Sequence, residues 1–127
     1  MRRGLIGFGL AVLVAAAPCA VLATTTLRGM MHNWRVDART TRAMLNGQMH
    51  FDEAAVRATL TRYAEDAGRI AASVNGQSAG SRDIRQRFLR LQSDSRTALT
   101  TLGRRTELRA NFSRVLSNCS SCHNIYN

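Results

Sequence analysis

The chain has 127 residues, a formal net charge of +10 at pH 7, and 18 basic residues that are all arginine. So positive a chain raises the question of nucleic-acid binding. The arginines are spread along every segment instead of gathering in one run, however, and the chain opens on an export signal. We therefore expect no nucleic-acid partner and interpret most arginines as solvated helix faces.

Residues 1–23 have the composition of an export signal. An Arg-Arg pair follows the first Met, and a 19-residue apolar stretch interrupted by Pro18 comes next. Short side chains before Thr24 fit cleavage after Ala23. We expect removal of this signal and one domain, residues 24–127, in the periplasm. The alternative is an uncleaved anchor, since 19 apolar residues can cross about 30 Å of hydrocarbon. The domain would then be held at the membrane and still face the periplasm.

The rest of the chain shows helical periodicity, with apolar residues every three or four positions. The first predicted helix runs from about Thr25 to Asn46 and ends at Gly47, and Asp52 is the predicted N-cap of the second. The first stripe consists of Leu27, Met31, Trp34, Ala38, Thr41 and Leu45. The second consists of Val56, Leu60, Tyr63, Ala67, Ile70 and Val74.

Residues 75–80 form the predicted loop that precedes a third helix, and Gly103 closes that helix. The third stripe consists of Ile84, Phe88, Leu91, Ser95, Ala98 and Leu102, and the fourth of Leu108, Phe112, Val115, Cys119, Cys122 and Tyr126. No proline interrupts residues 24–127. Short connections make consecutive helices antiparallel, so we predict an all-α, up-down-up-down four-helix bundle.

The sequence Cys119-Ser-Ser-Cys122-His123 has the C-x-x-C-H spacing at which haem c is attached. Residues three and four apart share a helix face, so both thiols and the imidazole can meet one flat macrocycle. A zinc site would need further ligands, and Cys19, His32 and His50 are distant in sequence. A redox C-x-x-C normally follows a strand, and none is predicted here. The spacing also permits a disulfide. We expect one covalent haem, with thioether bonds to Cys119 and Cys122 and with His123 as the proximal iron ligand.

A helical bundle with this motif at its end resembles the cytochrome c′ family of class II c-type cytochromes. The ending from Cys119 to Tyr126 is similar to the family's C-x-x-C-H-x-x-Tyr, and the segment from Gly47 to Asp52 is similar to its Gly-x-x-x-aromatic-Asp turn. The resemblance covers residues 24–127. It implies that the residue sixteen positions before Gly47 faces the open side of the haem, and that residue is Met31.

Met31 determines which function the resemblance implies. Met and His ligation of haem iron raises the reduction potential and suits electron transfer, as in a low-spin, methionine-ligated branch of the family. We expect Met31 to be the distal ligand, although methionine in a bundle stripe is commonly core filler. The alternative is a five-coordinate haem protein that binds or scavenges nitric oxide or carbon monoxide. The chain departs from the family where Asn127 replaces a cation and where the loop at residues 75–80 is short.

We expect no enzymatic activity, because no distal His-Arg pair has a recognisable spacing and methionine over the iron would block a substrate. The expected partner is a redox protein. If the surface of that partner is acidic, the positive charge of this chain would attract it. The resemblance also implies a homodimer through the first two helices. Five arginines on that face repel a second copy unless acidic groups intervene: Arg35, Arg39, Arg42, Arg57 and Arg62.

Overall fold

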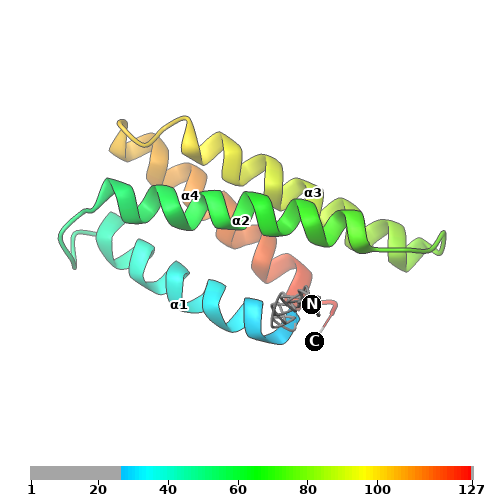
Figure 1. The fold of residues 1–127 in the computed structure, drawn as a ribbon. Coiled ribbons are helices and arrows are strands. Elements are labelled where there is room, and N and C mark those ends of the chain that lie inside the picture. The colour runs from blue at the N-terminus through cyan, green and yellow to red at the C-terminus, as the bar shows by residue number, and fades with distance from the viewer. Residues whose placement is uncertain (1–26, 127) are drawn as a thin grey trace, which may run out of the picture.

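The computed structural model describes residues 27–126. The expected signal or anchor, residues 1–23 with their cleavage position, lies outside the described residues. The described part consists of four helices, α1 (Leu27–Leu45), α2 (Glu53–Ser73), α3 (Ala79–Leu99) and α4 (Arg105–His123), and contains no strand. They lie alongside one another as a four-helix bundle (Figure 1). The predicted all-helical fold is therefore confirmed.

Side-chain caps determine where two of the helices begin. Asp52 accepts a hydrogen bond from the Ala55 N–H at 3.1 Å, which confirms it as the N-cap of α2. Ser78 accepts one from the Ser81 N–H at 3.1 Å and caps α3. Helix α3 thus starts at Ala79, inside the stretch 75–80 that we predicted to be a loop. That prediction was wrong because the serine cap outweighs the poor helix propensity of one glycine.

Gly47 ends the first helix as predicted. Its φ of +75° is left-handed, which glycine adopts without strain. Its N–H donates to the Met44 carbonyl at 3.2 Å, and the Gln48 N–H donates to the Ala43 carbonyl at 2.9 Å. This pair of hydrogen bonds is a Schellman motif, which satisfies carbonyls at the end of the helix.

The third helix ends earlier than predicted, at Leu99 instead of near Gly103. The hydroxyls of Thr100 and Thr101 donate to the carbonyls of Thr97 and Ala98, each at 2.7 Å. Hydrogen bonds from threonine hydroxyls to nearby carbonyls compete with the backbone hydrogen bonds that would continue the helix. The residues that follow, up to the start of α4, therefore form a turn.

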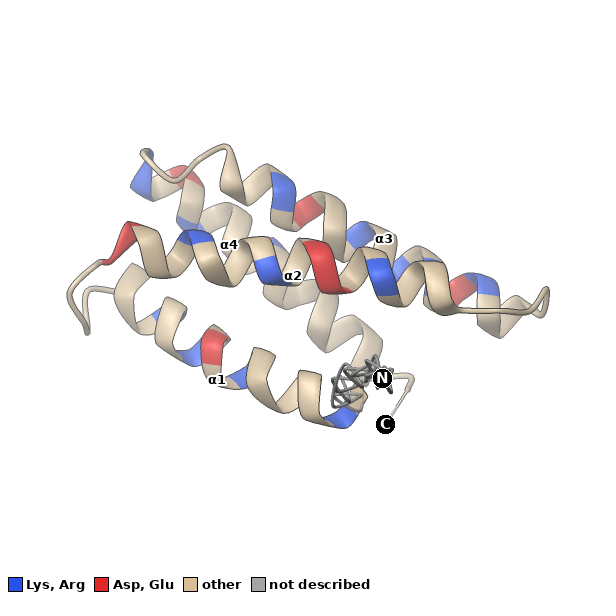
Figure 2. Cartoon of the chain, in the orientation of Figure 1, with Lys and Arg blue, Asp and Glu red and all other residues tan. Residues whose placement is uncertain are grey.

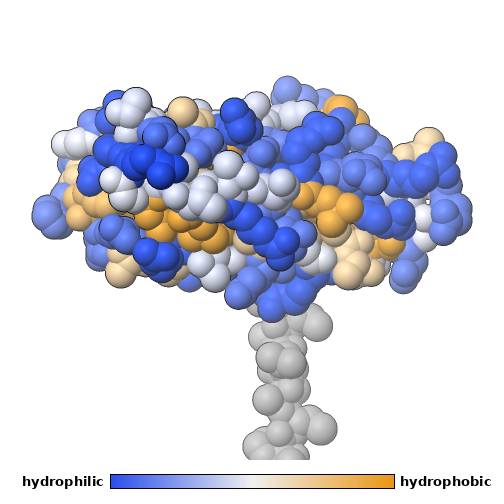
Figure 3. All heavy atoms as spheres, turned by 90° about the horizontal axis from the view of Figure 1, so that it is seen from above, coloured by the Kyte–Doolittle hydropathy of each residue, from blue (hydrophilic) through white to orange (hydrophobic). Residues whose placement is uncertain are grey.

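The core contains most residues of the predicted stripes, but Leu27, Val74, Cys119, Cys122 and Tyr126 do not belong to it. Leu27, predicted to belong to the first stripe, is 51 % exposed, so the packed part of that stripe begins at Met31. The fully buried side chains include Leu60, Tyr63 and Leu108. Polar side chains cover most of the face shown in Figure 3. No helix among residues 27–126 is long and apolar enough to cross a membrane.

Candidate functional site

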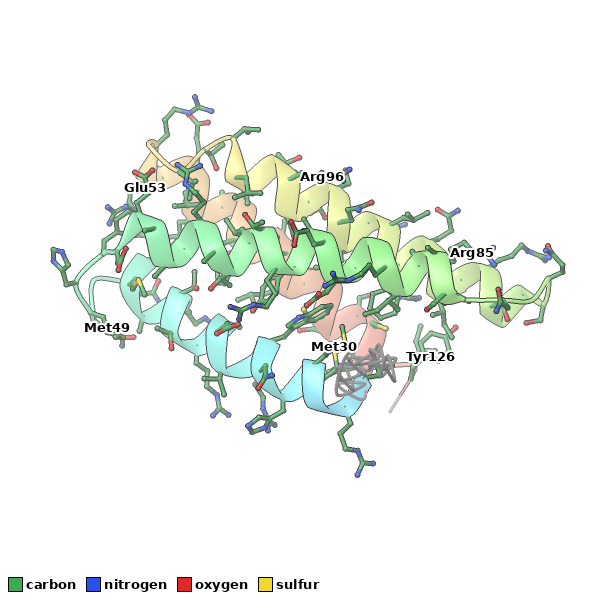
Figure 4. The ribbon with its side chains drawn as sticks, viewed as in Figure 1. Met30, Met49, Glu53, Arg85, Arg96 and Tyr126 are labelled. Carbon is green, nitrogen blue, oxygen red and sulfur yellow. The ribbon has the colours of Figure 1, made fainter. Side chains whose placement is uncertain are left out.

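A cavity of about 660 Å³ lies at the end of the bundle where α4 finishes, and all four helices contribute to its wall. Its lining includes all four residues singled out from the sequence: Met31 from α1 and Cys119, Cys122 and His123 from α4. Figure 4 shows Met30 and Tyr126 near this end of the molecule and Met49 near the other. Two segments far apart in sequence therefore enclose one space.

The last turn of α4 presents the cysteines and the histidine to the cavity. Cys119 and Cys122 are half-buried and free, and the Cys119 thiol donates to the Val115 carbonyl at 3.6 Å. His123 is exposed and ends the helix. The spacing of three and four residues places the three side chains along one face, as predicted.

The pKa of each of the two thiols is raised. Burial raises the pKa of the Cys119 thiol, and a charge on Cys122 would raise it further. Burial also raises the pKa of the Cys122 thiol, although the nearby Arg87 acts in the opposite direction. A thiol–disulfide exchanger needs a lowered thiol pKa, so these two cysteines do not resemble a redox pair. Among the described residues, no three His, Cys, Asp or Glu side chains form a group that could hold a metal ion.

Met31 is half-buried, packs against the core, and lines the same cavity as the C-x-x-C-H segment. The other described methionines, Met30, Met44 and Met49, do not line it. Met44, which the predicted first stripe does not include, is only 7 % exposed and belongs to the core. It follows the buried Thr41 by three residues and so shares its side of α1.

A hydrogen-bonded group of buried side chains forms part of the cavity wall. The Trp34 indole N–H donates to Asp66 at 3.1 Å, and the Tyr63 hydroxyl donates to the Trp34 carbonyl at 2.6 Å. The two rings lie 5.3 Å apart and are tilted by 54°. Asp66 also accepts from Arg69. These bonds lock the orientation of two large aromatic rings beside the space. Burial raises the pKa of Tyr63, and a charge on Cys119 adds to the effect.

A second cluster joins α3 to the end of α4. The Arg87 guanidinium donates to Asp83 at 2.8 Å and to the Ser121 hydroxyl at 2.9 Å. The Tyr126 hydroxyl donates to the same Asp83 oxygen at 2.7 Å. The Arg87 guanidinium and the Tyr126 hydroxyl lower the pKa of the Asp83 carboxyl. Arg87 also lines the cavity, so the cluster holds the segment around His123 against α3.

Asp66, Asp83 and Arg87 are not among the site residues that were predicted from the sequence. The four-residue spacing of Asp83 and Arg87 on a helix could have indicated their ion pair, but nothing local links either to α4. Of the remaining histidines, His32 is exposed and lines the cavity mouth, whereas His50 is exposed in the turn after α1.

No family model, curated protein or solved structure matches the chain. What can be concluded about its chemistry therefore depends on the cavity and on the residues that line it.

Proposed function

We propose that the protein is an exported c-type cytochrome that holds one covalent haem and carries electrons in the periplasm. The observation that supports the proposal best is the cavity, because Met31, Cys119, Cys122 and His123 all line it. Its volume of about 660 Å³ falls in the range of ligand pockets, roughly 300–1,000 Å³. A bound haem would supply one-electron exchange at its iron.

The last turn of α4 would hold the cofactor. The thiols of Cys119 and Cys122 would each add across one vinyl group, with sulfur bonding to one carbon and the proton going to the other. Both thiols are free and half-buried, and burial raises the pKa of each. His123 follows Cys122 directly, and its exposed imidazole is available to bind iron as the proximal ligand.

Met31 would provide the distal ligand from α1. Its thioether lies on the cavity side of a packed helix, and a soft sulfur ligand stabilises ferrous iron and raises the potential. Trp34 and Tyr63 would exclude water from the wall beside it, because both rings are buried and fixed by hydrogen bonds. A rigid wall that excludes water needs little structural rearrangement when the charge of the site changes.

The up-down-up-down order of helices and the resemblance to cytochromes c′ belong to the same proposal. The short connections between the helices support that order.

The export signal supports a location in the periplasm, because attachment of haem to thiols takes place outside the cytoplasm. Intact mass spectrometry of the exported protein tests this step. The expected mass lacks residues 1–23 and includes one haem, whereas an anchored protein would retain those residues and sediment with membranes.

Haem staining after denaturing electrophoresis tests the attachment. The wild-type band is expected to stain, and Cys119→Ser combined with Cys122→Ser is expected to abolish the stain. Ser120→Ala is the control, because Ser120 is exposed within the motif and its loss leaves the spacing of the cysteines unchanged. The proposal is wrong if haem washes away from the denatured wild type while both thiols react with an alkylating reagent.

A further inference from the structure

The positive charge of α1 lies along one side of the helix. Arg28, His32, Arg35, Arg39 and Arg42 are all exposed. At 3.6 residues per turn they fall within an arc of about 80°. The single acidic residue of α1 lies outside that arc and pairs instead with an arginine of α2. Figure 2 shows α1 with one acidic segment among several basic ones.

Three of these arginines border the cavity. Arg28, Arg35 and Arg42 line it and follow one another at intervals of seven residues, and we call them the arginine row. With a rise of 1.5 Å per residue the row is about 21 Å long. Within residues 27–126, none of the three guanidinium groups has an ion pair or a hydrogen bond. Their charge is therefore available to another molecule.

The charge of the cavity mouth stays positive after a cofactor has been bound. The lining contains a fourth arginine, Arg87, which is paired with Asp83, and no acidic residue. The proposed haem has two carboxylates, which neutralise at most two of the three arginines in the row. At least one unpaired guanidinium then remains beside the cofactor, with Arg39 and its charge on the same side of the helix.

We propose that the arginine row is the docking surface for an acidic redox-partner protein. This inference rests on the function proposed above. Guanidinium groups bind carboxylates bidentately and so fix the orientation of a partner, while the net field speeds its approach. Docking on the row brings the partner to the rim of the cavity, where the path to the cofactor is shortest.

An anionic membrane is the competing source of negative charge, and the structure favours the protein. An amphipathic helix that binds a lipid surface needs an exposed apolar face beside its basic one. The apolar face of α1 is already used, because Trp34, Met44 and Leu45 are buried in the bundle core. The large apolar side chains of α1 that stay exposed, Leu27 and Val36, are two separate residues and do not form an apolar face.

The test compares two variants of equal net charge. The row variant is Arg28→Gln/Arg35→Gln/Arg42→Gln. The matched control is Arg90→Gln/Arg96→Gln/Arg114→Gln, which removes three exposed arginines of α3 and α4 that do not line the cavity. Circular dichroism and the haem absorbance of both variants show that each is folded and loaded. If the row triple does not load, the single Arg35→Gln takes its place and the single Arg90→Gln becomes its control.

Poly-L-glutamate serves as the acidic polypeptide probe, and its binding to the haem-loaded protein is followed by ¹⁵N NMR. We expect shift changes confined to the residues around 28–42, reversed by salt, and at least tenfold weaker binding for the row variant than for the control. This readout does not depend on electron transfer. Equal weakening in both variants, or shift changes spread over α3 and α4, would overturn the proposal.

Stopped-flow oxidation by hexacyanoferrate(III) supplies the second readout. The reduced protein gives one electron to each hexacyanoferrate(III), which leaves as hexacyanoferrate(II). The rate constant at low salt is expected to fall about tenfold in the row variant and much less in the control, because steering depends on charge near the site of transfer. Equal rates for the two variants contradict the proposal.

Anionic phosphatidylglycerol vesicles distinguish the membrane from the protein partner. Sedimentation with vesicles is expected to fall equally in the row variant and the control, as a general charge effect. Loss in the row variant alone would assign the row to a membrane and overturn the proposal. If the wild-type protein carries no covalent haem, the proposed function is refuted. If the protein carries haem but substitution of the arginine row changes neither binding nor rate, only this inference is refuted.

Discussion

Tyr126 and Asp83 join the last residues of the described chain to α3. The Tyr126 hydroxyl donates to Oδ2 of Asp83 at 2.7 Å, and the same oxygen accepts from Nε of Arg87 at 2.8 Å. The two partners are 43 residues apart in sequence. One carboxylate oxygen thus ties the chain end that follows His123 to the helix facing it.

We expect Tyr126→Phe to release this end. The substitution keeps the ring beside Arg87 but removes the hydroxyl donor. Hydrogen exchange of the amides of Asn124, Ile125 and residue 126 should become several-fold faster, since opening of the last turn loses one restraint. Exchange in α2 should not change. Unchanged exchange at the chain end would mean that the bond to Asp83 does not hold it.

The buried Tyr63 predicts a loss of stability in alkaline solution. Burial raises the pKa of its hydroxyl above the usual 10.0. The unfolded chain therefore releases this proton at a lower pH than the folded one. The stabilising contribution of neutral Tyr63 is complete below about pH 10 and is lost as the pH rises toward the folded pKa.

Urea unfolding followed by far-UV circular dichroism measures this effect. In wild type the free energy of unfolding should fall as the pH rises above about 10. Tyr63→Phe should lose about 1 kcal/mol at neutral pH, because its hydrogen bond to the Trp34 carbonyl is gone. Its stability should then depend less on pH in the alkaline range. Equal slopes would show that another group is responsible.

The local features of this fold could be predicted from the sequence, because each is determined by residues that are only a few positions apart. The Asp52 cap, the Gly47 turn and the apolar stripes each depend on spacings shorter than two helical turns. Two helix ends, at Ala79 and Leu99, were predicted wrongly because the predictions relied on nearby glycines. In the structure, hydrogen bonds from serine and threonine hydroxyl groups determine both ends.

The cavity wall could be predicted only in part. The C-x-x-C-H spacing identified Cys119, Cys122 and His123, and the resemblance to cytochromes c′ identified Met31; all four line the cavity. The partners of Trp34 could not be found in this way, because Asp66 lies 32 residues further along the chain. Which polar residue meets an indole across two helices depends on how the helices pack, and no local pattern reports that.

Gly68 marks a close approach of α2 to the Gln92 side chain of α3. A Cβ at this position would lie 2.2 Å from Nε2 of Gln92, which donates to the Ala64 carbonyl at 3.2 Å. Gly68→Ala should gain about 1 kcal/mol in helix propensity and lose about as much by displacing that hydrogen bond. Its net effect on the free energy of unfolding should be close to zero.

A double-mutant cycle separates the two contributions. In a Gln92→Ala background no side chain has to move, so Gly68→Ala should stabilise the protein by about 1 kcal/mol in urea unfolding. The same stabilisation of about 1 kcal/mol in both backgrounds would mean that Gln92 accommodates the added methyl group without losing its hydrogen bond.

Met31→Ala tests the proposed distal ligand and with it the choice between electron transfer and gas binding. If Met31 binds iron, the substitution should convert the absorption spectrum from low to high spin and abolish the red-edge band of the iron–sulfur(Met) bond. The reduction potential should fall, because a soft ligand that favours ferrous iron is lost. Carbon monoxide should then bind quickly to the reduced protein, as stopped-flow absorbance would show.

Two methionines that do not line the cavity serve as controls. Met49→Ala removes an exposed side chain from the turn after α1 and should change neither the spectrum nor the stability. Met44→Ala truncates a core residue, so it should cost about 2–5 kcal/mol of stability while the iron stays low-spin. Suppose instead that wild type is already high-spin and that Met31→Ala affects only stability. Met31 would then be core packing, and the five-coordinate, gas-binding alternative would replace electron transfer as the proposed function.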